Sequence, residues 1–338
     1  RRVAESFPEL EIAYAIQDGT NPNDAHIMAG GAPSKRSQRE QVRRGFLAIL
    51  GGQKLSTSVE GSGRLQLADW IASDHNPLTA RVIANRVWHH HFGRGLVSSP
   101  SDFGIRGSRP SHPELLDYLA SYLIRSGWSI KSLHRHIMAS QSYQRQSMDS
   151  PSNATIDPEN IHLWRFNRQR MTAEQLRDSI LFLSGDLDPT PGSEHPFPHR
   201  LTYFYRQHEP FTENYQNNKR TVYRLRRRLE KDAFLDLFDG PDGNLHLASR
   251  RATTTTLQSL FFMNGTLIDK QSTKLAQRFT SPDFKPERNL GALYQNLFGR
   301  ASSPHEAAGL LAKDTVEHTL DWTLLAKAML SSNEFLFV

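Results

Sequence analysis

The first absence in this 338-residue sequence is cysteine, of which there is none. Without thiols the chain holds no disulfide, no thiolate zinc site, no iron–sulfur cluster and no haem joined through a Cys-x-x-Cys-His motif. We therefore expect no cofactor within it. Proteins without cysteine occur inside and outside the cytoplasm, so this absence alone leaves the compartment open.

Long apolar runs are also missing. The densest apolar stretches, GFLAILGG and LQSLFFMNG, are soon interrupted by glycine or polar residues, whereas a transmembrane helix needs about 18 or more apolar residues in succession. We expect a soluble chain without a membrane span. Because the sequence begins RRVAESFPEL, without Met and without a signal-peptide core, we also expect it to be a piece of a longer protein.

The short motifs of common enzyme classes are absent as well. The sequence has no P-loop, no glycine pattern for dinucleotides, no His-Glu-x-x-His and no Gly-x-Ser-x-Gly. This argues against the classical nucleotide-binding and hydrolase folds. Whether the protein is an enzyme stays open at this point.

Positive charge is in excess, mostly as arginine. The 41 Lys and Arg outnumber the 35 Asp and Glu, and the net charge is +6. Guanidinium groups form paired hydrogen bonds with carboxylate, phosphate or sulfate, so an acidic partner such as an acidic polysaccharide is a reasonable expectation. The excess is modest for this length, and a solvated surface also explains it.

The chain begins with extended patterns and continues with helical ones. Residues 10–16 alternate apolar and polar, as a half-buried strand does, and residues 25–31 resemble them. A flexible Ser- and Gly-rich connection follows, with a boundary near Ser62. We predict a mainly α fold, an irregular multi-helix domain with a small β-containing N-terminal segment, divided into residues 1–61, a helical domain over 62–338, and a long irregular loop at 186–219 within that domain.

Several helix ends are marked in the sequence. Asn76 and Pro77 suit the cap and first turn of a helix that Gly93 ends. Ser111 and Glu114 have the spacing of a capping box.

Further helix ends follow along the chain. Gly127 suits a helix end and Ser129 a cap, and Thr172 and Gln175 form a second candidate capping box. More helices are predicted over residues 232–239, 253–279, 288–299, 304–314 and 321–335.

Ordered phrases in the sequence resemble a known family. They include NPLTARVIANRVWHHHFGRGLVSSPSDFG, PSHPELLDYLA, RMTAEQLRDSILFLSG, RTVYRLRRR, FDGPDGN, RRATTTTLQSLFFMN and SSNEFLFV. From about Leu65 to the C-terminus the chain resembles the planctomycete-specific C-terminal domain of unknown function. The resemblance implies a domain of a large exported protein, hence an extracytoplasmic location, with haem possible in a separate upstream cytochrome-c-like domain. It supplies no catalytic residues.

Three consecutive histidines lie on the helix predicted after Pro77. Such neighbours span about 200° at ~3.6 residues per turn, so they cannot all face one ion, and we predict no metal site. One could still act with a distant group, and the candidates for catalysis are His89, Asp102 and His112. Surface histidines near a helix end, and an aspartate that shapes a turn, are the commoner explanations.

Asn85 lies within an apolar stripe of the same helix. A buried amide needs hydrogen-bond partners, and we expect the backbone of the following loop, residues 93–104, to supply them. Binding of a ligand by Asn85 with Arg81 and Arg86 is the alternative.

Arg250 and Arg251 precede a helix that starts in a run of threonines. Free backbone N–H groups at its head, with two guanidiniums nearby, could hold an anion. Salt bridges to Asp239 or Asp242 are the commoner explanation.

Arg224 and Arg226 lie beside Tyr223 in the stretch KRTVYRLRRR. Basic side chains interleaved with aromatic ones suit charged sugars or single-stranded nucleic acid. A solvated or salt-bridged strand edge is the commoner explanation.

Three classes of function follow. The favoured one is a non-catalytic interaction or glycan-binding module of an exported, cytochrome-associated protein, which docks other domains of its parent or acidic polysaccharide. The second is an oxidative or hydrolytic enzyme domain acting on polysaccharide, whose candidate residues must meet in one cleft. Those residues are Asn85, His89, Asp102, His112 and Arg250. The third, nucleic-acid binding, is disfavoured by the exported context.

Overall fold

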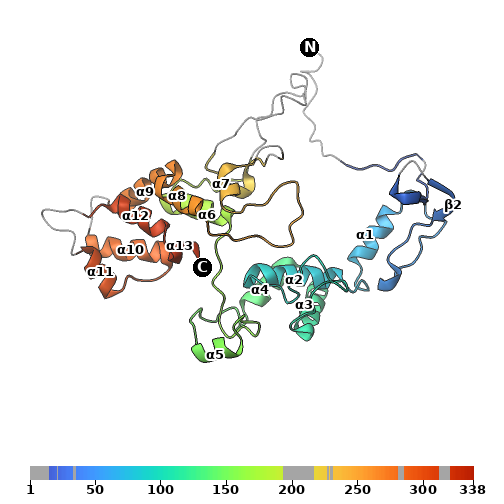
Figure 1. Ribbon diagram of the computed structural model, residues 1–338, viewed down its shortest axis with the longest axis horizontal. Coiled ribbons are helices and arrows are strands. Elements are labelled where there is room, and N and C mark those ends of the chain that lie inside the picture. The colour runs from blue at the N-terminus through green and yellow to red at the C-terminus, as the bar shows by residue number, and fades with distance from the viewer. Residues whose placement is uncertain are drawn as a thin grey trace, which may run out of the picture. The chain divides into compact units, whose positions relative to one another are not determined.

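The computed structural model describes residues 15–20, 22–32, 36–192, 217–226, 228, 231–280, 285–311 and 320–338. Helices make up 48% of the structure and strands 4%, with one small sheet near the N-terminus. This confirms the predicted mainly α, multi-helix fold with a small β-containing segment. The chain divides into two compact units, Arg1–Gln144 and Arg145–Val338 (Figure 1). The predicted boundary near Ser62 lies inside the first unit, and it stays a prediction.

The sheet of the first unit has two antiparallel strands. Strand β1 (Ala25–Met28) pairs with β2 (Arg36–Val42), with an irregular register between His26 and Met28. The short 3-10 turn η2 (Ala29–Gly31) follows β1. The strand predicted at residues 10–16 lies outside the described residues except for 15 and 16, which are not in a strand.

One ion pair and one aromatic stack connect this N-terminal part to the first helix. The 3-10 turn η3 (Ala48–Leu50) precedes α1 (Arg64–Ala72). Phe46 stacks on Trp70 of α1 with ring centroids 5.2 Å apart. Asp18 forms an ion pair of 2.5 Å with Arg64 at the start of α1. These contacts hold residues before Ser62 against the first helix.

The core of the first unit lies among three helices, α2 (Thr79–Phe92), α3 (Pro113–Arg125) and α4 (Ile130–Met138) (Figure 1). Apolar residues recur at helical spacing and are fully or almost fully buried on each helix. They include Ala84, Phe92, Leu119, Leu123, Leu133 and Ile137.

The helix ends of the first unit agree only partly with the prediction. Asn76 accepts hydrogen bonds from the backbone of Leu78 and Thr79, and Gly93 ends α2 in the left-handed conformation with φ 76°. The predicted capping box of Ser111 and Glu114 is wrong. The helix begins at Pro113, so His112 and not Ser111 occupies the cap position, and no side chain caps the helix. The Ser111 hydroxyl donates to the carbonyl of Leu96.

The second unit is built around α9 (Thr266–Phe279). It packs against α6 (Ala173–Ser184), α8 (Thr256–Asn264), α10 (Pro286–Phe298) and α12 (Trp322–Leu330). The shorter helices are α5 (Pro151–Ile156), α7 (Ala233–Leu237), α11 (Pro304–Leu311) and α13 (Asn333–Leu336). The buried core runs through all the long helices and includes Leu176, Ile180, Ile268, Leu275, Leu290, Leu293, Ala326 and Leu330.

Two helix predictions in the second unit have opposite outcomes. The capping box of Thr172 and Gln175 is present at the start of α6. The single helix predicted over 253–279 is wrong, because the chain turns extended at Gly265 and separates α8 from α9. A Cβ atom at Gly265 would lie 2.5 Å from the carbonyl oxygen of Phe261, so the turn requires glycine.

The C-terminus pairs with the segment that leads into α6. Gln169 and Val338 exchange two backbone hydrogen bonds of 2.7 and 2.9 Å, and Met171 donates to the carbonyl of Leu336. Residues more than 160 positions apart are thereby joined by backbone contacts. The final family-like phrase, SSNEFLFV, therefore closes the second unit.

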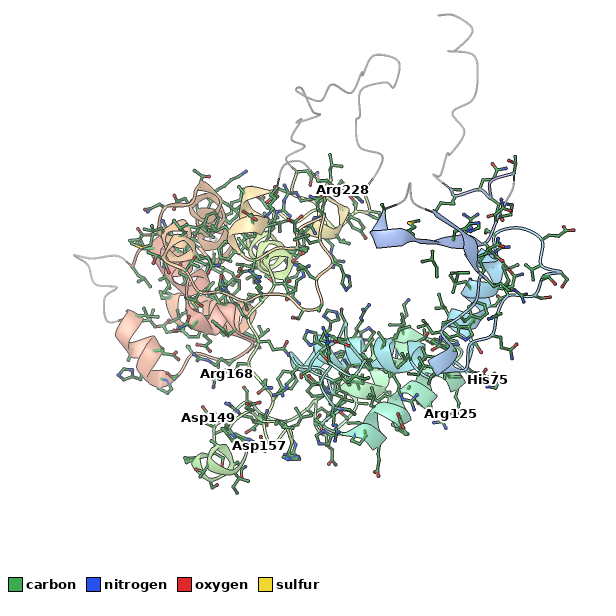
Figure 2. The ribbon with its side chains drawn as sticks, turned by 45° about the vertical axis from the view of Figure 1, so that its right-hand side comes forward. His75, Arg125, Asp149, Asp157, Arg168 and Arg228 are labelled. Carbon is green, nitrogen blue, oxygen red and sulfur yellow. The ribbon has the colours of Figure 1, made fainter. Side chains whose placement is uncertain are left out.

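The segment after α5 is stabilised by two buried polar side chains. Asp157 accepts backbone hydrogen bonds from Ile161 and His162 (Figure 2). Asn160, in the left-handed conformation, donates to the carbonyl of Arg165. This compact loop precedes the strand-like pairing at Gln169.

Most of the predicted loop at 186–219 lies outside the described residues, but its two ends are joined. The Asp188 amide donates to Asn218, the Arg220 amide donates to Asp188, and the Lys219 ammonium lies 2.9 Å from the Asp188 carboxylate. Because both ends lie at the end of α6, residues on either side of the loop reach one place. No helix in the described part of the chain is long and apolar enough to cross a membrane.

Candidate functional site

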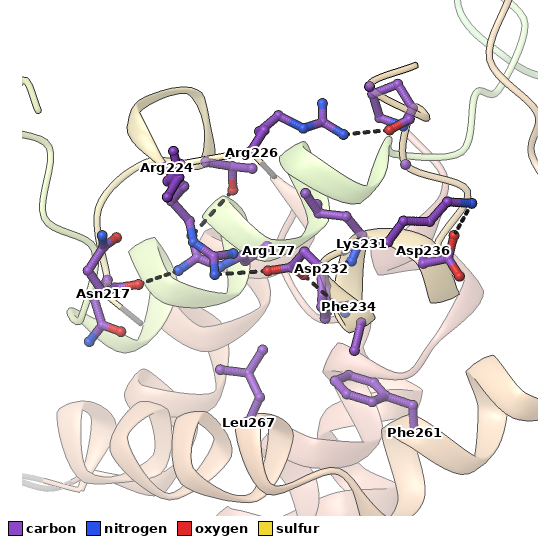
Figure 3. A pocket seen from close by; sticks show the side chains of 18 of the residues that line it. Arg177, Asn217, Arg224, Arg226, Lys231, Asp232, Phe234, Asp236, Phe261 and Leu267 are labelled. Carbon is purple, nitrogen blue, oxygen red and sulfur yellow. Dashed lines mark hydrogen bonds and ion pairs between the residues drawn. The ribbon is translucent and has the colours of Figure 1, made fainter. Parts of the chain in front are cut away.

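The second unit contains a pocket of about 880 Å³ (Figure 3). Its walls come from α6, the 3-10 turn η4 (Thr221–Tyr223), the stretch after it, α7, and the ends of α8 and α9 that face each other at Gly265. Six cationic residues line it: Arg177, Arg224, Arg226, Arg228, Lys231 and Lys270. Four carboxylates, of Asp188, Asp232, Asp236 and Asp242, accompany them.

Arg177 is the most enclosed of the cations. It lies on the buried side of α6, where its guanidinium donates to the carbonyls of Asn217 and Lys219 at 2.7 and 2.9 Å. Burial, and then the nearby charge of Arg224, lower the pKa of Arg177 from 12.5 to about 10. It remains charged at neutral pH, so the protein holds two guanidiniums close together at this wall.

Arg224 is nine-tenths buried and forms an ion pair of 2.9 Å with Asp232. Asp232 also caps α7 by accepting the backbone N–H groups of Phe234 and Leu235. The Nε atom of Arg224 is buried and has no hydrogen-bond partner among the described residues. Buried donors are nearly always paired in folded proteins, so this atom calls for an explanation.

Gln271 on α9 has a buried acceptor without a partner, whereas Arg224 has a buried donor without one. It is 1% exposed, and its Nε2 donates to the Asp186 carboxylate at 3.0 Å. Its Oε1 atom is buried without a donor in the part of the chain that the structure describes. The wall of one pocket thus contains an unpaired donor and an unpaired acceptor. Neither atom is exposed to solvent.

The outer cations of the pocket differ in how they are held. Lys231 bridges Asp236 and Asp242 at 3.2 and 3.6 Å. Arg226, Arg228 and Lys270 are exposed and form no ion pair with any described residue. Three positive charges therefore remain available at the mouth of the pocket.

Apolar side chains line the opposite side. Phe234, Phe261 and Leu267 lie below the charged groups in Figure 3. Phe234 and Phe261 meet edge to face with ring centroids 5.5 Å apart. The pocket therefore offers one charged wall and one apolar wall, the combination typical of sites that bind small polar molecules.

A second network fixes the elements around the pocket. Asp239, whose φ is 61°, accepts hydrogen bonds from the backbone and hydroxyl groups of Thr253. Arg170 donates to Gln258, and Gln258 donates to the carbonyl of Leu237 at 2.8 Å. The four phrases RMTAEQLRDS, RTVYRLRRR, FDGPDGN and RRATTTTLQSLFFMN thus meet around one hollow.

The anion site predicted at the head of α8 is occupied by the protein's own groups. Arg250 pairs with Glu174 at 2.8 Å, and not with Asp239 or Asp242 as the alternative explanation predicted. The hydroxyl of Thr255 caps α8 in a capping box with Gln258. Arg251 is exposed. The capping box thus already pairs the N–H groups of Thr255 and Gln258 at this helix head.

Arg224 and Arg226, in contrast to Arg250 and Arg251, both line the pocket. Here the predicted arginine-rich stretch does lie at a hollow. Arg226 donates to the carbonyl of Pro241 at 2.5 Å, which positions it beside the FDGPDGN loop.

The remaining candidates belong to the first unit. Asn85 is fully buried, accepts the Val97 N–H at 2.8 Å and donates to the Val97 carbonyl at 3.0 Å. Its amide anchors the loop, as the backbone explanation predicted. Arg81 pairs with Asp117 at 2.6 Å, and Arg86 is exposed.

The three candidates for catalysis have separate surroundings. Asp102 accepts the Gly104 N–H at 2.8 Å and so shapes a turn, and His112 lies 3.0 Å from the hydroxyl of Ser111. His89 is half-buried, and burial lowers its pKa. Arg250, which the enzyme hypothesis requires alongside them, is in the second unit.

Sequence reasoning missed Arg177 and Gln271. Arg177 lies next to buried Leu176 and three residues before buried Ile180, so a charged residue falls on an apolar helix face. That position was visible in the sequence. Gln271 gave no such sign, because its importance depends on the packing of α9 against α6.

The protein is therefore a mainly α domain whose pocket is lined by both basic and acidic side chains. A family model described as a protein of unknown function (DUF1553) matches residues 63–332, which is most of the chain. The chain belongs to this family. No curated protein and no solved structure matches it.

Proposed function

We propose that the chain is a non-catalytic binding module whose pocket in the second unit binds acidic ligands, acidic polysaccharide above all. The observation that supports this most is the lining of the pocket, where three exposed cations have no ion-pair partner among the described residues. Such cations attract anions over distances of about a Debye length, ~8–10 Å at physiological salt. The clustered guanidiniums of Arg177 and Arg224 add to the same field.

Two carboxylates of the pocket are poorly suited to act as general acids. Hydrogen bonds from Thr190 and Lys219 lower the pKa of Asp188 to about 2. The Asn244 backbone, and then Lys231, lower the pKa of Asp242. A general acid that works near neutral pH needs a raised pKa, and these two groups move in the other direction.

Partners and location belong to the same proposal. On the resemblance of the ordered phrases, we place the module in an exported protein outside the cytoplasm, where other domains of its parent dock with it. Haem, if the parent binds it, is assigned to a separate upstream segment. Recombinant fusion to candidate neighbouring domains, followed by analytical ultracentrifugation, checks the docking part.

The pocket itself is tested by titration calorimetry with a polyuronate and a sulfated polysaccharide at low and raised salt. The variant is Arg226→Ala with Arg228→Ala. Two exposed ionic contacts of about 0.7 kcal/mol each predict roughly a tenfold loss of affinity. The matched control is Arg109→Ala with Arg125→Ala, two exposed arginines of the first unit that make the same change in net charge.

Each outcome has a clear meaning. A tenfold loss in the pocket variant and less than a twofold loss in the control support the proposal. Equal losses in both show that the chain attracts polyanions only through its overall charge, and the proposal then fails. Tighter, steeply salt-dependent binding of duplex DNA favours the nucleic-acid alternative.

A further inference from the structure

The polar groups of the pocket restrict the ligand further than its positive charge does. Four carboxylates, of Asp188, Asp232, Asp236 and Asp242, lie among the six cations. A densely charged phosphate ligand would face these four negative groups as well as the cations. Hydroxyl groups, in contrast, donate to carboxylates. A lining of this kind suits a ligand with few charges and many hydroxyls.

Gln271 sets a second restriction. Its Nε2 atom donates to Asp186, and Asp186 is in turn paired with Lys274, so the orientation of the amide is fixed by its partners. The buried atom without a partner among the described residues is therefore the oxygen, Oε1. An acceptor of this kind needs a donor. A sulfate or a phosphodiester has only acceptors at neutral pH and cannot supply one.

Arg224 needs a hydrogen-bond acceptor, whereas Gln271 needs a donor. Its unpaired Nε requires an acceptor, and the clustered guanidiniums favour a charged one. One ligand must therefore present an anionic acceptor and a neutral donor within the span of a single pocket. A sugar ring that bears a carboxylate has both, because its hydroxyl groups lie next to the charged group.

The apolar wall suits the same ligand. Phe234, Phe261 and Leu267 can cover the C–H face of a sugar ring while its hydroxyls turn toward the carboxylates. The volume of about 880 Å³ is near the upper end of the usual range for ligand pockets. The hollow therefore has room for more than one ring of a chain.

We propose that the pocket binds uronic acid units of an acidic polysaccharide, an inference that rests on the proposed function of the site. The carboxylate of one unit lies at Arg224 and Arg226. A ring hydroxyl donates to Gln271 Oε1 after a small shift of that side chain, and the ring packs on Phe261. An acidic peptide also has carboxylates and N–H donors, but it offers fewer donors per charge to the four carboxylates of the lining.

The test compares four ligands by titration calorimetry on the full chain. They are an oligogalacturonate of defined length, its methyl ester, a fully sulfated oligosaccharide that has the same number of charges and no free hydroxyl group, and a polyglutamate peptide. We expect the oligogalacturonate to bind at least tenfold more tightly than each of the other three. Equal or tighter binding of the sulfated sugar or the peptide overturns the uronate inference and leaves the proposed function standing. Failure of all four to bind overturns both.

Two variants separate recognition from folding. Gln271→Met keeps the volume of the side chain and removes the acceptor, and we expect it to weaken oligogalacturonate about tenfold and the sulfated sugar hardly at all. Lys270→Ala is exposed and should fold normally; we expect it to weaken both charged sugars alike. A Gln271→Met protein that melts normally and still prefers oligogalacturonate tenfold contradicts the role given to Gln271. If Gln271→Met does not fold, Phe261→Leu takes its place, with the same selective loss expected.

Discussion

Buried polar groups in the two units differ in whether the protein itself pairs them, as Asn85 and the pocket residues Arg224 and Gln271 show. In the first unit, Asn85 is fully buried and its amide both donates to and accepts from Val97. In the second, Arg224 Nε and Gln271 Oε1 are buried in one pocket wall without partners in the described chain. Buried polar groups that find partners within the protein stabilise a loop, whereas those that do not mark a place where another molecule can bind.

Unpaired buried atoms also occur away from the pocket lining, at Arg165 Nε, Arg170 Nη1 and Glu174 Oε2 in the second unit. His89 Nδ1 in the first unit is also buried without a partner among the described residues. Burial lowers the pKa of His89, which keeps the imidazole neutral, and a neutral ring nitrogen costs less to leave unpaired than a guanidinium. Among the described residues, only Arg224 and Gln271 combine an unpaired buried atom with a place in the lining of this pocket.

The largest expected effect follows from removing the internally paired amide. Asn85→Ala leaves the buried N–H and carbonyl of Val97 unpaired at about 1–3 kcal/mol each, so we expect the free energy of unfolding to fall by about 2–5 kcal/mol. Urea unfolding followed by circular dichroism measures it.

The neighbouring Arg86→Ala is the control, because Arg86 is exposed and should change stability by less than about 0.5 kcal/mol. If Asn85→Ala is as stable as Arg86→Ala, the amide does not anchor the loop, and the contrast between the two units is lost.

A smaller effect is expected from pH. His91 Nε2 lies 2.7 Å from His134 Nδ1, and burial, followed by the charges of His134 and His90, lowers the pKa of His91. A histidine whose pKa is lower in the folded state binds protons more readily when unfolded, so stability is full above about pH 6.5 and falls below it.

The second unit should respond at lower pH. Lys274, and also Gln271, lower the pKa of Asp186 by hydrogen bonding, and the pKa of Asp188 is about 2. Their contribution is present above about pH 4 and is lost only as pH falls further. Hydrogen exchange resolved by peptide, corrected for the intrinsic rate at each pH, should show less protection around α2 and α4 at pH 5.0 than at pH 7.5, and none of this change near Asp188. Uniform acceleration in both units contradicts the assignment.

The helical fold could be predicted because residues next to each helix end determine where the helix begins or ends. Thr172 with Gln175 and Gly93 act within one turn of the chain, and both form as expected. Ser111 forms no capping box, because α3 begins with His112 at the cap position, and the Ser111 hydroxyl donates to Leu96, fifteen positions away. The break at Gly265 was missed because apolar periodicity continues across it.

The site was less predictable than the fold. Arg224 and Arg226 could be proposed from the interleaving of basic and aromatic residues. Gln271 and Lys270 could not, because they reach the pocket only through the packing of α9 against α6. A pocket built from segments far apart in sequence depends on tertiary contacts, and local patterns do not encode them.

The smallest expected effect concerns the second arginine pair. Arg250→Ala with Arg251→Ala removes two positive charges, but Arg250 is paired with Glu174, and the helix head beside it is capped by Thr255. We therefore expect the affinity for a polyuronate to change by less than about twofold, against the tenfold loss expected for Arg226→Ala with Arg228→Ala. Calorimetric titration of both variants at one salt concentration decides between them. A larger loss in the Arg250 variant would move the binding site to the head of α8 and would show that unpaired buried atoms are a poor guide to function in this protein.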